Sequence, residues 1–242
     1  MGARPSSFKV GIVEERPATK GPERNWSSQQ IDIFGWFENE CTCHFEDDCV
    51  QRIQYLVVRA RAGTGKTTTI IEGVNRAPES SILVCAFNKR IAEELNTRID
   101  NSSAEAKTLH ALGYAAISRQ WPGIPVAEGS RRGDWLTDQV CAPATPKPIR
   151  RLVTLLHTKA REMCPTTASP EALTNLALFF DYVPDEGWVR YPLAYVVQLA
   201  GAALAQAAHE APSYDVGIDF ADMIYLPLVW SLLAKNYDLV VV

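Results

Sequence analysis

Residues 60–67 have the composition of a phosphate-binding loop. The stretch reads Ala60-Arg61-Ala62-Gly63-Thr64-Gly65-Lys66-Thr67, and Ala60 replaces the Gly that usually opens this pattern. Gly63 and Gly65 can adopt positive φ, so backbone N–H groups can face anionic oxygens without a clash at Cβ. Lys66 is expected to reach the β- and γ-phosphates, and the Thr67 hydroxyl is expected to ligate Mg²⁺. The loop predicts a nucleotide site with Mg²⁺, in which Lys66 and Thr67 face the phosphates.

The segments on either side of this loop favour the same interpretation. Residues 54–59 form a short, β-rich, nearly continuous apolar run that is typical of a buried parallel strand. Residues 67–76 can continue as a helix, whose positive dipole end would face the phosphates. The alternative is a Gly-containing turn between a strand and a helix that binds nothing.

Further strand and helix signals follow along the chain. Residues 81–87 and 106–110 are expected to form strands of a parallel sheet, each followed by a helix, the first ending near residue 99 and the second near residue 119. Before the loop, Ser27 is a good N-cap for a helix containing Ile31, Phe34 and Phe37 at helical spacing.

The composition changes between residues 120 and 148, and helical periodicity dominates afterwards. An amphipathic helix is expected at residues 149–164, with Met163 on the apolar face and Arg161 on the polar face. Further helices are expected at residues 170–182 and, as a buried or amphipathic helix, at 192–210. Residues 219–227 should return to the core as a helix, and residues 237–242 should form a buried strand. The expected organisation is a flexible leader (1–24), the first part of a core (25–118), a helical insertion (119–212) and a return to the core (213–242).

Composition sets broad limits on function. With 242 residues and a net charge of −4, the chain can bury a sizeable core and carries no overall basic field, so nucleic acid would have to meet a local patch. No signal peptide or membrane span is expected, which favours a cytoplasmic protein with reduced thiols. Cys41, Cys43, His44 and Cys49 invite a zinc interpretation, but their spacing is not a usual one, and a variable loop is the preferred alternative.

The motifs together resemble the N-terminal half of a superfamily 1 DNA helicase of the UvrD/Rep-like group. Residues 26–30 look like the glutamine motif, with Gln30 (or Gln29) on adenine, and residues 62–68 look like motif I. The resemblance assigns the site for ATP and Mg²⁺ to Gln30, Ala62, Gly63, Thr64, Gly65, Lys66, Thr67 and Thr68, with Lys66 and Thr67 as its catalytic groups. Residues 86–90 resemble motif Ia and residues 107–113 resemble motif Ib, which assigns DNA contacts to Phe87, Asn88, Lys89, Thr108 and His110. Without this pattern, Phe87 would be interpreted as a core aromatic and His110 as a helix cap.

The resemblance implies a RecA-like P-loop core of α/β class with an inserted all-helical accessory subdomain. It also implies ATP-driven movement along single-stranded DNA and unwinding of duplex DNA. The Asp-Glu pair of motif II, motifs III to VI and the C-terminal motor domain are not in the 242 residues, so we expect little turnover from this chain alone. The alternatives are a nucleotide-dependent, non-catalytic DNA-binding module and, more distantly, another P-loop enzyme such as a small-molecule kinase.

Overall fold

The structure of the chain is a computed structural model that describes residues 25–38, 55–163, 166, 168–233 and 235–242. The predicted leader (1–24) and the segment with Cys41, Cys43, His44 and Cys49 lie outside these residues. Within the described ranges, no group of His, Cys, Asp and Glu side chains is arranged to hold a metal ion. In the same ranges, no helix has both the length and the apolar character that crossing a membrane requires.

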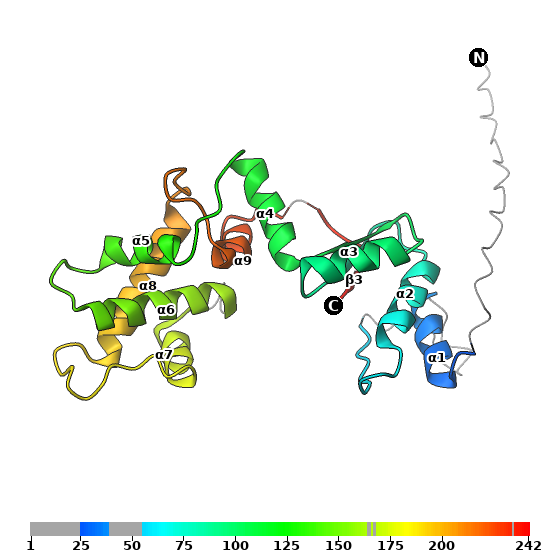
Figure 1. The fold of residues 1–242 in the computed structure, drawn as a ribbon, viewed down its shortest axis with the longest axis horizontal. Helices are drawn as coiled ribbons and strands as arrows, with labels where there is room; N and C mark the ends of the chain where they lie inside the picture. Colours follow the sequence, from blue (N-terminus) through cyan, green and yellow to red (C-terminus); the bar gives the residue numbers. More distant parts are fainter. Residues whose placement is uncertain (1–24, 39–54, 164–165, 167, 234) are drawn as a thin grey trace, which may run out of the picture.

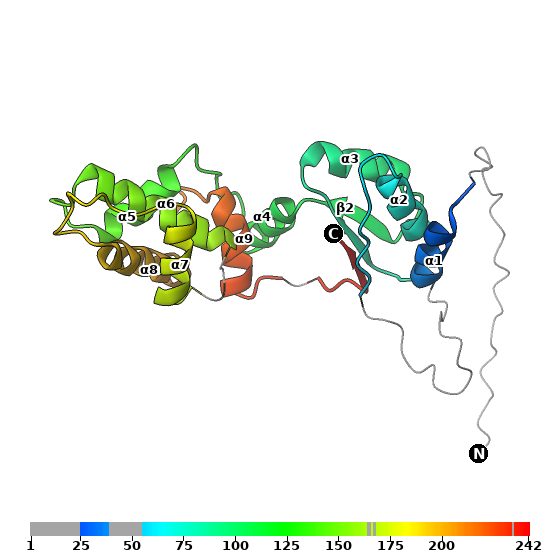
Figure 2. The ribbon, with the colours of Figure 1, turned by 90° about the horizontal axis from the view of Figure 1, so that it is seen from below.

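A small parallel sheet occupies one end of the molecule (Figures 1 and 2). Its strands are β1 (Ile82–Cys85), β2 (Ala104–Lys107) and β3 (Leu239–Val241), in the order β2-β1-β3. Ile82 pairs with Ala104 on one side and with Leu239 on the other, and both pairings are parallel. The predicted parallel strands after the phosphate loop are therefore confirmed, and the chain is of α/β class.

Helices α1 (Ser28–Phe37), α2 (Lys66–Arg76) and α3 (Lys89–Arg98) belong to the sheet region, which we define as the described residues of 25–108 and 235–242. Its hydrophobic cluster joins Phe37, Ile71 and Val74 from the helices to Ile82 and Leu239 from the sheet. Ser27 caps α1 in a capping box with Gln30, as the sequence predicted for Ser27.

The predicted buried strand before the phosphate loop is wrong. Residues 55–60 form no ladder with the described strands, and their side chains are exposed, Tyr55 to 77% and Val57 to 74%. Among the three described strands this segment has no hydrogen-bonding partner. Its β-favouring composition has no effect without such a partner, because strand preference expresses packing against neighbouring strands.

Six helices make up the helical region, defined as the described residues of 109–233. They are α4 (Leu109–Gln120), α5 (Arg131–Val140), α6 (Lys147–Met163), α7 (Pro170–Phe179), α8 (Leu193–His209) and α9 (Phe220–Val229). Helices α5 to α8 lie at the end of the molecule away from the sheet, with α4 and α9 between (Figures 1 and 2). A second hydrophobic cluster, which includes Ile117, Leu156, Leu204 and Leu226, fills this region.

Two features of the helical region differ from the expectation. Helix α5 was not predicted, because Arg132, Gly133 and Thr137 interrupt its apolar pattern although all three are buried. Helix α9 was expected with the sheet, but it packs against α4 and α6 and contributes Met223 and Leu226 to the helical cluster. The chain rejoins the sheet at β3, where Leu239 is buried and Val240 is half exposed, so the predicted buried strand is only partly buried.

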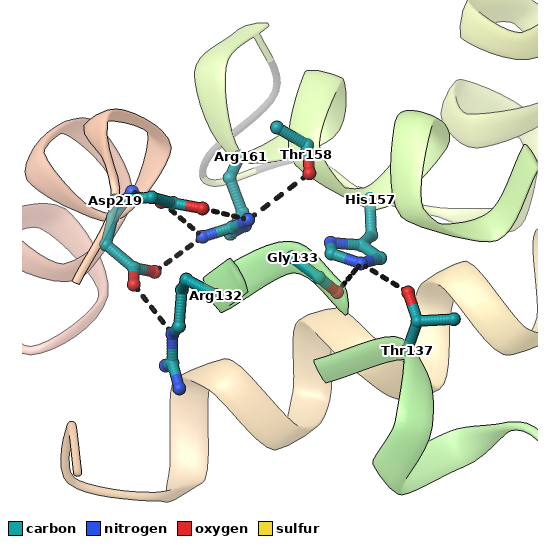
Figure 3. A network of polar contacts seen from close by, with 8 residues as sticks. Arg132, Gly133, Thr137, His157, Thr158, Arg161 and Asp219 are labelled. Carbon is teal, nitrogen blue, oxygen red and sulfur yellow. Dashed lines mark hydrogen bonds and ion pairs between the residues drawn. The ribbon is translucent and has the colours of Figure 1, made fainter. Parts of the chain in front are cut away.

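A buried network of charges holds α5, α6 and α9 together (Figure 3). Arg161 donates from Nη1 to Asp222 (2.7 Å) and from Nη1 and Nη2 to the two carboxylate oxygens of Asp219 (2.8 and 2.9 Å). Arg132 donates to the other oxygen of Asp222 (2.8 Å). Arg161 was expected on the polar face of α6 and Met163 on the apolar face; instead Arg161 is fully buried and Met163 is exposed.

Candidate nucleotide and nucleic-acid site

The phosphate loop has the backbone geometry that its glycines predict. Gly63 has φ 78° and Gly65 has φ 80°, both in the left-handed region that disfavours side chains. Gly65 is the N-cap of α2, so the loop passes directly into the first turn of a helix of 11 residues.

Lys66 extends back across the loop. Its Nζ donates to the carbonyl oxygens of Ala60 (3.1 Å) and Arg61 (2.9 Å), and the Thr64 hydroxyl donates to the Arg61 carbonyl (2.8 Å). These contacts are exposed to solvent, so they can be exchanged for contacts to anionic oxygens at little cost. The ammonium is thereby held within the curve of the loop, where a phosphate chain would pass.

Among the described residues, no side chain caps the start of α2, because Gly65 offers no side-chain acceptor. The starts of α5 and α8 also lack a side-chain cap, whereas α1, α3, α4, α7 and α9 begin with a side chain that accepts from the first turn. The N–H groups at such a helix start are suited to an anion. The Thr67 side chain is exposed in this turn and can offer its oxygen to a cation. The residues present therefore fit a nucleotide phosphate chain with Mg²⁺, with Ala62 and Thr68 on either side of the central residues.

Gln30 lies beside this loop. Its Nε2 donates to the Thr69 hydroxyl (2.7 Å), which in turn donates to the Gly65 carbonyl (3.1 Å). Its Oε1 accepts from the Ser27 N–H (3.0 Å), so the amide is oriented from both ends. Gln29 is exposed in the same helix. Of the two glutamines that the sequence offered, Gln30 is the one connected to the loop.

Phe87, Asn88 and Lys89 follow β1 directly. Phe87 is 93% exposed, which excludes the alternative interpretation as a core aromatic. The Asn88 side chain caps α3 by accepting from the Ile91 N–H (2.9 Å), and Lys89 lies 3.7 Å from Glu93 on an exposed face. These three residues are accessible at one edge of the sheet.

Thr108 and His110 follow β2 at the same edge. Cys85 pairs with Lys107, and the Ala86 N–H donates to the Lys107 carbonyl (2.9 Å), so the segments that follow β1 and β2 leave the sheet side by side. Thr108 caps α4 by accepting from the Ala111 N–H (3.1 Å). His110 is therefore not the cap that the alternative interpretation required; its ring meets the edge of the Phe220 ring.

One polar cluster in the sheet region was not anticipated from the sequence. Glu105 on β2 accepts from Lys235 (2.6 Å) and from the Tyr237 hydroxyl (2.7 Å) and is paired with Lys107. These donors lower the pKa of Glu105 to about 2. The cluster attaches the segment before β3 to the outer strand β2. Its members are spread along the chain without a motif, so no sequence signal indicates them.

Comparison with known proteins agrees with this geometry. Residues 49–240 match a family model described as AAA domain. The F-box DNA helicase 1 of Gallus gallus is 26% identical over 108 residues, which is 45% of this chain and 10% of that protein. The F-box DNA helicase protein 1 of Schizosaccharomyces pombe is 39% identical over 79 residues, which is 33% of this chain and 9% of that protein. The matched segments thus span about a tenth of these relatives.

The family match covers most of the chain and includes the phosphate loop, strands β1 and β2, the described helices between them and β3, and the start of β3. The relatives are DNA helicases by name, and the loop geometry is that of a P-loop. The chain belongs to the AAA domain family of P-loop NTPases, within the UvrD/Rep-like superfamily 1 helicases.

Proposed function

We propose that this chain is the ATP-binding and single-strand-binding part of a DNA helicase. The observation that carries the proposal is the uncapped start of α2 behind a loop that already holds Lys66 on its own carbonyls. The N–H groups of this helix start and the Lys66 ammonium together favour an anionic ligand. In the longer protein, ATP hydrolysis would drive translocation along one strand and unwinding of the duplex.

In this proposal each residue of the loop has a defined part. The N–H groups of residues 62–68 bind the phosphates, and Lys66 stabilises the negative charge on the transferred phosphoryl group. Thr67 ligates the Mg²⁺ that accompanies ATP, which supplies charge neutralisation between the phosphates. Gln30 recognises adenine; its place beside the loop supports this role.

Phe87, Asn88, Lys89, Thr108 and His110 form the proposed DNA surface. The capping contacts of Asn88 and Thr108 use side-chain oxygens as acceptors, so the Asn88 NH₂ group and the Thr108 hydroxyl hydrogen stay available as donors to phosphate. Phe87 offers an exposed ring on which a base of any sequence can stack. Two side-chain donors to DNA phosphates and one stacking platform at one sheet edge suit binding of a strand without sequence preference.

We also propose that the sheet region is a RecA-like core and that most of the helical region is an accessory insertion in it. The support is that β1 pairs with both β2 and β3, although the whole helical region separates β2 from β3 in the sequence. Each region also has its own hydrophobic cluster.

The experiment that tests this function is titration of the purified chain with a fluorescent ATP analogue and Mg²⁺, with and without oligo-dT. Lys66→Ala should abolish nucleotide binding, and Phe87→Ala should selectively weaken oligo-dT binding. Lys159→Ala, a surface lysine paired with Glu162 in the helical region, is the matched control and should bind both ligands like the wild type. A folded wild-type chain that binds neither ligand would contradict the proposal.

A further inference from the structure

Thr69 connects the two parts of the proposed nucleotide site. It lies near the start of α2, which packs beside α1 (Figures 1 and 2). Its hydroxyl donates to the Gly65 carbonyl of the phosphate loop (3.1 Å) and accepts from Nε2 of Gln30 on α1 (2.7 Å). One hydroxyl thus joins the glutamine proposed to recognise adenine to the loop proposed to bind the phosphates.

The helix itself does not require the Thr69 hydroxyl. The Gly65 carbonyl already accepts from the Thr69 backbone N–H (2.9 Å), as in any regular α-helix. Thr69 is only 6% exposed, and a buried hydroxyl is costly unless it is hydrogen-bonded. What the hydroxyl adds to the backbone bond is the contact between α2 and Gln30.

The orientation of the Gln30 amide is fixed at both ends. The Ser27 N–H can only donate, so it faces the Oε1 oxygen (3.0 Å). The Thr69 hydroxyl hydrogen is directed to the Gly65 carbonyl, so the hydroxyl oxygen accepts from Nε2. A reversed amide would place two donors against each other at Ser27 and would take the Thr69 hydroxyl away from Gly65.

We propose that Thr69 is a positioning residue, which fixes the Gln30 amide and thereby makes the nucleotide site prefer adenine to guanine. This inference rests on the proposed nucleotide-binding function. Beside its contacts to Ser27 and Thr69, the amide retains one Nε2 hydrogen and one lone pair on Oε1. Adenine offers the matching pair, an acceptor at N7 and a donor at N6, whereas guanine offers acceptors at both N7 and O6. A fixed amide therefore matches adenine and opposes one guanine acceptor with its own oxygen.

The test titrates the full chain and Thr69→Val with ribose-labelled fluorescent analogues of ATP and of GTP, each with Mg²⁺. Valine keeps the shape of threonine and removes the hydroxyl, so the Gln30 amide loses one of its two fixed ends. We expect the affinity for the ATP analogue to fall about 2- to 12-fold, the equivalent of one hydrogen bond, while the affinity for the GTP analogue stays unchanged. Thr69→Ser restores the hydroxyl and should recover the affinity for the ATP analogue.

Two further variants separate base selection from a general effect on the fold. Thr97→Val is the matched control, because the Thr97 hydroxyl donates to the Glu94 carbonyl within α3 (2.7 Å), and it should bind both analogues like the wild type. In a Gln30→Ala background, Thr69→Val should change the affinity for neither analogue, because its effect passes through the amide. Circular dichroism melts of each variant establish that altered binding does not reflect unfolding.

The outcomes distinguish this inference from the proposed function. If the wild-type chain binds neither analogue, the proposed function fails and this inference fails with it. If the ATP analogue binds and Lys66→Ala abolishes that binding, the nucleotide site stands whatever Thr69 does. The role of Thr69 in base selection is then overturned by a wild-type chain without preference for the ATP analogue, or by Thr69→Val weakening neither analogue or both equally. Failure of Thr69→Ser to recover the affinity, or a full effect of Thr69→Val in the Gln30→Ala background, would overturn it too.

Discussion

The sheet region and the helical region differ in where they place their polar and charged groups. We call the helical region closed because most of its helices bury an apolar face in one cluster, although Phe179 and Val189 are exposed, and because its buried charges, Arg132 and Arg161, are paired with carboxylates. The sheet region is open: Tyr55, Val57 and Phe87 are exposed, and its loop carries hydrogen bonds in contact with solvent. The groups proposed to bind nucleotide and DNA lie in or at the border of the open region. Residues that bind ligands must be accessible, and the packed helices of the helical region hold the neighbouring part of this accessible surface in place.

The largest expected effect is in the closed region. Arg161→Met leaves Asp219 without its arginine and Asp222 with Arg132 alone, so we expect the free energy of unfolding to fall by about 3–5 kcal/mol. Arg98→Met in α3 of the sheet region is the matched control, because the Arg98 side chain is 37% exposed and pairs with Glu94 one helical turn away. That variant should lose less than about 0.5 kcal/mol. Equal losses in urea denaturation would contradict the contrast between the regions.

Two glycines test how tightly each region is packed. A Cβ at Gly113 on α4 would lie 1.6 Å from the Met223 carbonyl oxygen on α9, and a Cβ at Gly73 on α2 would lie 2.3 Å from the Phe37 ring. A ring can rotate or shift, but a helix backbone must move as a unit. We therefore expect Gly113→Ala to lower the free energy of unfolding by about 1–3 kcal/mol or more, and Gly73→Ala to lower it by less.

Gly201→Ala is the control for both glycines. It lies within α8, and its nearest neighbour would be at the ordinary contact distance of 3.7 Å. Higher helix propensity should raise its free energy of unfolding by about 0.5–1 kcal/mol. Chemical denaturation of the three variants ranks their free energies of unfolding. A Gly113→Ala protein as stable as Gly201→Ala would contradict the close contact between α4 and α9.

The two regions should also differ in their response to acid. Burial, and then the nearby Arg161 charge, lower the pKa of His157 in α6 from 6.5 to about 3. Between these two pH values His157 is protonated in the unfolded chain and neutral in the folded chain. The free energy of unfolding therefore falls as pH decreases from about 6.5, by up to about 1.4 kcal/mol per pH unit. His157→Gln should remove this slope when unfolding is measured from pH 7 to pH 5.

Glu105 supplies the contrasting case in the sheet region. Its pKa is lowered from 4.5 to about 2 by its hydrogen bonds to Lys107, Lys235 and Tyr237. The stability that it contributes is present above pH 4.5 and is lost as pH falls from there towards 2. Glu105→Gln should therefore leave the slope between pH 7 and pH 5 unchanged. If the dependence of the free energy of unfolding on pH between 7 and 5 were reduced in Glu105→Gln, or unchanged in His157→Gln, His157 would not be its source.

The features predicted correctly from the sequence are those specified by neighbouring residues. Ser27 caps the helix that follows it, and the glycines of the phosphate loop adopt positive φ. These depend on a few adjacent side chains and backbone angles. Helix α5 was missed because Arg132 is buried opposite Asp222, a partner that lies far away in the sequence.

The smallest expected effect tests the corrected segment before the phosphate loop. Val57 is 74% exposed, whereas Val84 on β1 is 3% exposed. Replacement of Val by Thr keeps the shape and the β preference but adds a hydroxyl, which costs about 1–3 kcal/mol when buried without a partner. Val84→Thr should show that loss, and Val57→Thr should stay within about 0.5 kcal/mol of the wild type. An equal loss in Val57→Thr would mean that residues 55–59 form a buried strand. The sheet region would then bury its apolar residues as fully as the helical region does.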